Sequence, residues 1–208
     1  MNERLPAFGA LICAAGSSSR MGGIKKEFQI LPESTRPMTT VLGAAVSVFA
    51  SIREIGPILV AIPQGMEDAA RASLPAALAG RIEFVAGGKS RQESVHRALQ
   101  ALQAHMPAYV LIHDGARPWI SADVVLRIMD KVREYGAAIP ILPLVETPKE
   151  IDESGMILRH LPRSRVGTAQ TPQGFPFPAI LHAHEKAALR EGIEYTDDAE
   201  SGPNLKAR

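Results

Sequence analysis

Short apolar segments of strand length alternate with segments of helical periodicity along most of this chain of 208 residues. The predicted strands are 7–14, 57–63, 81–87, 109–113 and 137–142, and the predicted helices are 39–51, 66–78, 90–106, 121–136 and 177–190. Strands that alternate with helices of this length form right-handed βαβ units, because parallel neighbours need a crossover connection. The pattern therefore predicts an α/β fold with a mainly parallel sheet and helices on both faces.

Two of these helices carry clear start signals. Ser90 and Glu93 have the spacing of a capping box, and Ser121 can cap the helix that follows it. Gly136 is placed to end that second helix. Its core-facing residues are predicted to be Val125, Ile128, Met129 and Val132.

The alternation stops at residues 143–170, where polar stretches punctuated by proline flank two short strand-like pieces, "MILRH" and "RVGTAQ". We expect this segment to leave the sheet as a β-hairpin arm at about 143–165. The length allows one well-buried domain, so residues 1–208 are predicted to form a single domain with this arm.

Composition excludes several classes of function. The formal net charge of +1 provides no basic field for nucleic acid, so an anionic ligand must be met by clustered cations. Cys13 is the only cysteine, which excludes an intramolecular disulfide and favours a buried, inert thiol. No apolar run approaches the ~20 residues of a membrane span, and the N-terminus lacks a signal-peptide core. We expect no membrane partner and a cytoplasmic location.

The loops after the predicted strands are where an open parallel sheet binds ligands. The first, "AAGSSSRMGGIKK" at 14–26, combines glycines with cations as a phosphate cradle does. It does not match the P-loop pattern, because, counted from Gly16, Met21 stands where the second glycine is required. It does not match G-x-G-x-x-G either, because Ser18 stands at the second glycine of that pattern. A basic surface loop without a ligand is the alternative interpretation.

Two further loops add weaker signals. "GGKSRQES" at 87–94 places two glycines before a capped helix, which is typical of an anion site but also of a simple turn. In "HDGARP" at 113–118, Asp114 directly follows a strand and could bind Mg²⁺, or it could cap the next turn or pair with Arg117. His113 is predicted to be structural, since no second histidine lies at ligand spacing.

Six ordered motifs together are more specific than any one of them. They are "AAGSSSRMGGIKKEF", "GGKSRQESV", "HDGARP", "ETPKEI", "PRSRVGTAQTPQGF" and "YTDDA". In this order the chain, from residue 8 to about 206, resembles the 2-C-methyl-D-erythritol 4-phosphate cytidylyltransferases of non-mevalonate isoprenoid biosynthesis. The resemblance implies a Rossmann-like three-layer α/β/α fold of the nucleotide-diphosphosugar-transferase type, with an arm that joins a homodimer. It also implies transfer of CMP from CTP to the acceptor phosphate, with Mg²⁺ and release of pyrophosphate.

The same resemblance assigns roles to individual residues. Arg20 and Lys26 would stabilise the transition state, although Lys25 stands where the family often has proline, so either lysine could be the catalytic one. Residues implied to contact CTP are Ala14, Ala15, Gly16, Gly88, Lys89, Ser94 and Gly115. Asp114 would bind Mg²⁺. Residues implied on the acceptor side are Arg117, Thr147, Arg163 and Lys206, with Arg163 and Lys206 positioning the acceptor phosphate.

The carboxyl-terminal part departs from the family pattern. After "YTDDAES" the resemblance implies another strand before Asn204 and a helix after it, whereas "GPNLKAR" follows at once. We expect these segments to be omitted from the printed chain, because their deletion would uncover apolar surface. Three alternatives stay open: a cytidylyltransferase for ribitol 5-phosphate or another polyol phosphate, a dinucleotide-binding oxidoreductase, and a binding protein without turnover.

Overall fold

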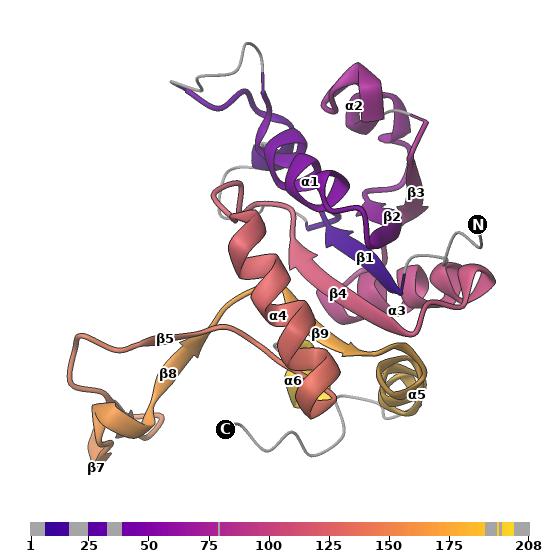
Figure 1. The fold of residues 1–208 in the computed structure, drawn as a ribbon. Coiled ribbons are helices and arrows are strands. Elements are labelled where there is room, and N and C mark those ends of the chain that lie inside the picture. The colour runs from indigo at the N-terminus through magenta and orange to yellow at the C-terminus, as the bar shows by residue number, and fades with distance from the viewer. Residues whose placement is uncertain are drawn as a thin grey trace.

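The computed structural model describes residues 7–16, 25–32, 39–78, 80–189, 195 and 197–201, which form three layers around one sheet (Figure 1). The strands of this sheet are β1 (Phe8–Cys13), β2 (Ile55–Ile62), β3 (Ile82–Ala86), β4 (Tyr109–Asp114) and β9 (Gln173–Pro176), in the spatial order β3-β2-β1-β4-β9. The first four strands are parallel and β9 is antiparallel to β4. The predicted α/β class with a mainly parallel sheet is confirmed.

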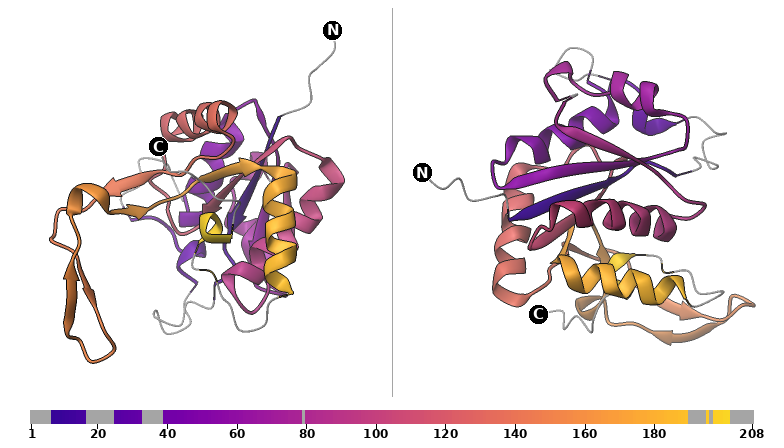
Figure 2. Two further views of the ribbon diagram at one scale, coloured as in Figure 1. Left: turned by 90° about the horizontal axis from the view of Figure 1, so that it is seen from below. Right: turned by 90° about the vertical axis from the view of Figure 1, so that its right-hand side faces the viewer.

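Helices cover both faces of the sheet (Figure 2). They are α1 (Val41–Ser51), α2 (Glu67–Ala72), α3 (Arg91–Leu102), α4 (Ala122–Tyr135), α5 (Phe177–Ala188) and α6 (Asp198–Ser201), with 3₁₀ turns η2 (Lys26–Phe28), η3 (Ala76–Leu78), η4 (Gln103–His105) and η5 (Arg163–Arg165). Neighbouring side chains of a strand enter opposite layers, so that Ile12 packs with α1 and α4 while Leu11 packs with α3 and α5. Because both faces are covered, the central strands β1 and β2 carry no charged side chain. None of the helices in the described ranges combines the length and apolar character needed to cross a bilayer.

The two predicted helix caps, Ser90 and Ser121, and the predicted stop near Gly136 are confirmed. The Ser90 hydroxyl accepts the Glu93 N–H at 3.1 Å, and the Ser121 hydroxyl accepts the Val124 N–H at 3.4 Å. Each such cap contributes about 1 kcal/mol. Helix α4 ends at Tyr135, and its C-cap is Gly136, whose φ of 87° lies in the region that favours glycine.

Two predicted helices are shorter in the structure than their sequence pattern. The helix expected over 66–78 ends at Ala72, because Pro75 has no N–H and its ring disfavours a helical predecessor. The helix expected to reach Met106 ends at Leu102 and continues only as the turn η4. Met106 is 83% exposed with a φ of 45°, so the assignment of this residue to the apolar stripe was wrong.

The predicted strand 137–142 does not join the main sheet as a full strand. Ala138 forms an isolated antiparallel bridge with Gly174, after which Pro140 interrupts the pairing and the chain leaves the sheet. The edge strand next to β4 is β9 instead, and the two pair in antiparallel register from Tyr109↔Pro176 to Ile112↔Gln173.

A pair of two-stranded ribbons projects from the body of the molecule (Figures 1 and 2). In the inner ribbon β5 (Ile141–Pro143) pairs with β8 (Gly167–Ala169), and in the outer one β6 (Lys149–Ile151) pairs with β7 (Ile157–His160). We call residues 141–169 the arm. Its strands are short and mostly exposed.

Candidate active site

The carboxyl ends of four strands meet at one edge of the sheet. Cys13 is in register with Ala61 and with Asp114, and Ile62 is in register with Ala86. The loops that follow β1, β3 and β4 therefore start side by side, as the sequence analysis expected of an α/β sheet. The Cys13 thiol is half-buried, and burial raises its pKa above the ordinary value, which keeps it protonated.

The first loop leaves β1 through Ala14, Ala15 and Gly16. Ala14 is buried and its N–H donates to the Ala61 carbonyl at 2.8 Å, whereas Gly16 is exposed. The ammonium of Lys25 donates to the Gly16 carbonyl and brings the two described ends of the loop together. The intervening residues 17–24, with the predicted catalytic Arg20, lie outside the described part of the chain.

The structure distinguishes the two candidate lysines. Lys25 is committed to the Gly16 carbonyl, while Lys26 begins the 3₁₀ turn η2 and is exposed. Within the described ranges the Lys26 ammonium has no hydrogen-bonding or ionic partner. Of the two lysines described in this loop, Lys26 is therefore the one whose ammonium is available to bind an anionic ligand.

The second loop is packed against the first. A Cβ at Gly87 would lie 2.2 Å from the Ala15 Cβ, so only glycine fits there. The Gly88 N–H donates to the Ser94 hydroxyl at 3.0 Å, and that hydroxyl donates to the Ser90 carbonyl at 2.8 Å. Ser94, expected to contact CTP, thus shapes the loop that would hold the nucleotide.

Glu93 stabilises the same loop from the first turn of α3. Its carboxylate accepts the Lys89 N–H at 2.7 Å and pairs with Arg97 at 2.6 Å. The hydrogen bond from Lys89, followed by Arg97, lowers the pKa of Glu93 despite some desolvation. In a simple capping box the Glu93 carboxylate would accept the Ser90 N–H. Here it accepts the N–H of the preceding residue, Lys89.

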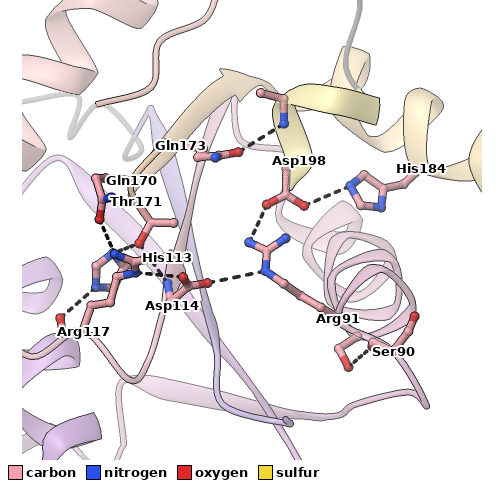
Figure 3. A network of polar contacts seen from close by, with 12 residues as sticks. Ser90, Arg91, His113, Asp114, Arg117, Gln170, Thr171, Gln173, His184 and Asp198 are labelled. Atoms are coloured by element: carbon pink, nitrogen blue, oxygen red, sulfur yellow. Dashed lines mark hydrogen bonds and ion pairs between the residues drawn. The ribbon is translucent and has the colours of Figure 1, made fainter. Parts of the chain in front are cut away.

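Asp114 is the last residue of β4, where the third loop begins, and its carboxylate lies between two arginines (Figure 3). Its Oδ2 accepts Arg117 Nε at 2.9 Å, and its Oδ1 lies 3.4 Å from Arg91 Nε. The pairing with Arg117 that the sequence allowed is therefore present. The carboxylate is 29% exposed and its oxygens have further lone pairs, so a cation could still share it.

A chain of hydrogen bonds fixes the backbone beneath Asp114 (Figure 3). The Asp114 N–H donates to the Thr171 hydroxyl at 3.2 Å, which lies 2.9 Å from Nδ1 of the buried His113. His113 Nε2 lies 3.2 Å from the Arg117 carbonyl, so this network assigns the proton to Nε2. Burial lowers the pKa of His113 to about 4, and its role is structural as predicted.

Sequence reasoning missed a buried ionic cluster behind this loop. Arg91 Nη2 lies 2.7 Å from Oδ2 of Asp198, and Oδ1 of Asp198 lies 3.3 Å from Nε2 of His184, without hydrogen-bond alignment (Figure 3). Burial raises the pKa of Asp198, but His184 and Arg91 outweigh this effect and hold that pKa below its ordinary value. Asp198 belongs to the quoted motif "YTDDA", which was the one available signal.

The predicted acceptor-side residues are not gathered at this edge. Thr147 and Arg163 lie in the arm, where Arg163 donates to the Val145 carbonyl at 3.1 Å. Arg117 lies at the edge and also donates to Gln170. Lys206 lies outside the described residues.

Comparison with known proteins now decides the family. The sequence matches the family of 2-C-methyl-D-erythritol 4-phosphate cytidylyltransferases over residues 8–203. This chain belongs to that family.

Individual relatives agree with the match. A bifunctional enzyme IspD/IspF of Bradyrhizobium sp. (strain ORS 278) is 40% identical over 194 residues, which is 91% of this chain and 47% of the relative. The cytidylyltransferase structure from Thermus thermophilus is 34% identical, with a TM-score of 0.70 over 93% of this chain and 81% of that one. A 4-diphosphocytidyl-2C-methyl-D-erythritol synthase structure from Anaerococcus prevotii has a TM-score of 0.77 and 28% identity, covering 93% and 80% of the two chains. The chain spans about half the length of the curated relatives it matches.

Proposed function

We propose that this protein transfers CMP from CTP to 2-C-methyl-D-erythritol 4-phosphate, giving 4-diphosphocytidyl-2-C-methyl-D-erythritol and pyrophosphate. One observation carries the proposal: the three loops that bear the motifs start at the same edge of the sheet. Asp114 lies there, and the first loop supplies the Lys26 ammonium, which has no partner within the described ranges. Family membership and the similarity to solved cytidylyltransferases support the same reaction.

The chemistry needs positioning and positive charge more than it needs a base. The acceptor phosphate is already anionic, since its second pKa is ~6, and its oxygen can attack the α-phosphorus of CTP directly. Negative charge then builds on the equatorial oxygens while pyrophosphate leaves in line. The backbone at Ala14–Gly16, together with Lys26 and Arg20, would bind and stabilise these oxygens.

Asp114 would hold Mg²⁺ in this scheme. Within the described ranges no three acidic, histidine or cysteine side chains cluster as a metal cage. Mg²⁺ is commonly bound by one or two carboxylates together with substrate phosphates, so the donor set fits. When bound, the ion would neutralise charge on the phosphates. Gly88, Lys89 and Ser94 would form the cytosine and ribose side, and Gly115 would lie beside Asp114.

An acceptor assay tests the proposal. The protein is incubated with CTP, Mg²⁺ and either methylerythritol phosphate or ribitol 5-phosphate, and the rate of pyrophosphate release is measured. We expect release to be at least about tenfold slower with ribitol 5-phosphate, which lacks the branching methyl group. Faster turnover of ribitol 5-phosphate would reassign the acceptor. Binding of NADH without binding of CTP would favour an oxidoreductase, and CTP binding without pyrophosphate release would favour a binding protein.

We further propose that the arm joins two copies of the chain and brings Thr147 and Arg163 to the partner's acceptor site. The arm exposes large apolar side chains that a single chain does not cover: Ile141, Leu142, Val145, Ile151, Met156, Ile157 and Leu158. Such a concentration of exposed apolar side chains is typical of an interface.

Sedimentation velocity tests the arm. We expect the wild-type protein to sediment as a dimer and Leu158→Glu to weaken dimerisation by at least about tenfold, because an unpaired charge would be buried. Met106→Glu is the matched control, since Met106 is also exposed but lies outside the arm. A monomeric wild-type protein, or an unchanged dimer with Leu158→Glu, would contradict this assembly.

A further inference from the structure

The second loop of the candidate site, at residues 87–89, uses all of its N–H groups inside the protein. The partners are the Ile62 carbonyl for Gly87 at 2.7 Å, the Ser94 hydroxyl for Gly88 at 3.0 Å, and the Glu93 carboxylate for Lys89 at 2.7 Å. A phosphate cradle offers unbonded N–H groups to an anion, so this loop is not built as one. It can present carbonyl oxygens and the Lys89 side chain, which suits the nucleoside part of CTP.

The Arg97 guanidinium holds this loop at both of its ends. From the second turn of α3, its Nη1 donates to the Gly87 carbonyl at 2.9 Å, and its Nη2 lies 2.6 Å from Oε1 of Glu93. The other oxygen of Glu93, Oε2, accepts the Lys89 N–H. Arg97 therefore holds the first residue of the loop directly and the last residue through Glu93.

The middle of the loop lies against the side chain that Arg97 orients. A Cβ at Gly88 would lie 2.3 Å from both Cγ and Cδ of Glu93, so the loop backbone packs directly on this side chain. An exposed ion pair by itself contributes little to stability. The planar fork of Arg97 does more than pair with one charge, because it fixes a carboxylate and a backbone carbonyl relative to each other.

We propose that Arg97 is a positioning residue for CTP, which orients Glu93 and the Gly87 carbonyl and so holds the 87–89 loop in the conformation that receives the nucleoside. The inference rests on the proposed function for the identity of the ligand, whereas the order of the loop does not depend on it. Without the fork the loop can take several conformations. CTP must then select one of them, and its apparent affinity falls by the fraction of the protein in that conformation.

Amide hydrogen exchange without nucleotide tests the order of the loop. We expect the Lys89 N–H to exchange at least about threefold faster in Arg97→Met than in the wild-type protein, because its carboxylate acceptor is no longer held in place. Exchange followed by nuclear magnetic resonance resolves this single amide.

Calorimetric titration with CTP and Mg²⁺, without an acceptor, tests the consequence for the ligand. We expect Arg97→Met to raise the dissociation constant of CTP by about fivefold or more. In steady-state kinetics the KM for CTP should rise to a similar extent while kcat falls by less than about twofold, because the loop serves the nucleoside and not the reacting phosphorus.

Arg97→Lys separates positioning from charge. Lysine keeps the positive charge but lacks the planar fork that fixes the Gly87 carbonyl and Glu93 together. We therefore expect CTP to bind Arg97→Lys at least about threefold more weakly than the wild-type protein. Wild-type affinity in this variant would mean that charge alone is needed, and would overturn the inference.

Arg133→Met is the matched control for the loss of a surface arginine. Arg133 is comparably exposed and also pairs with acidic side chains, but it lies on α4 beside Phe8, at the start of β1 and away from the candidate site. We expect less than about a twofold change in CTP affinity and in Lys89 exchange, because the 87–89 loop keeps all its contacts.

A double variant tests the route through Glu93. If Arg97 acts through this carboxylate, Glu93→Gln and Arg97→Met together should weaken CTP binding by at least about twofold less than the product of their separate effects. Fully multiplicative effects would overturn this route. Unchanged Lys89 exchange or unchanged CTP affinity in Arg97→Met would overturn the inference. A wild-type protein that does not bind CTP would contradict the proposed function, and the exchange measurement would still decide whether Arg97 orders the loop.

Discussion

Lys26→Ala is expected to lower the rate of CMP transfer by about 10²–10³-fold, the usual loss when one preorganised charge donor is removed from a transition state. The reason lies in the two neighbouring lysines of the first loop. Lys25 is bonded to the Gly16 carbonyl, whereas Lys26 is exposed and has no partner within the described ranges. Steady-state kinetics with saturating CTP measure this effect directly.

Lys25→Ala is the matched variant for this prediction. Because Lys25 joins the two described ends of the loop, its loss should raise the KM for CTP more than it lowers kcat. Circular dichroism melting of both variants should stay close to that of the wild-type protein, since both side chains lie at the surface of the loop. A larger fall in kcat for Lys25→Ala than for Lys26→Ala would exchange the roles of the two residues.

Gly87→Ala is expected to destabilise the fold by about 3 kcal/mol, at the upper end of overpacking costs. The added Cβ would lie 2.2 Å from the Ala15 Cβ and 2.9 Å from the Ser94 hydroxyl, in a position where the Gly87 backbone is fixed by its bond to the Ile62 carbonyl. The first and second loops must then move apart. Urea denaturation should show a lower midpoint with an unchanged slope.

Gly16→Ala is the control for this substitution. Gly16 lies in the adjoining loop, but a Cβ there meets nothing within 4 Å among the described residues. We expect a change of less than about 0.5 kcal/mol, as for other surface substitutions. Equal destabilisation by both variants would mean that loss of glycine flexibility, and not the contact with Ala15, is responsible.

Local signals predicted the elements that depend on local chemistry. The caps at Ser90 and Ser121 lie where the sequence indicated, and the predicted apolar residues of α4 are buried. These features depend on residues a few positions apart in one helix. Periodicity alone was insufficient at Pro75 and Pro140, where the missing N–H ended an otherwise regular pattern.

Strand β9 could not be found by the same reasoning. Its sequence "QGFP" is four residues long and contains both glycine and proline, so it carries no alternation of its own. Pairing with β4, and the bridge between Gly174 and Ala138, make it the edge of the sheet. The backbone partners of this strand, and not its propensity, determine its conformation.

The sequence by itself determined the α/β class, the helix caps at Ser90 and Ser121 and the three loops that carry the motifs of the candidate site, because periodicity, caps and glycine-rich turns act over short distances along the chain. The tertiary structure alone decided which of the two lysines is tied to the loop backbone, why Gly87 must be glycine, and how Arg91 is shared between Asp114 and Asp198. These last features join residues up to 107 positions apart, and their energies exist only once burial and strand register have brought the charges together.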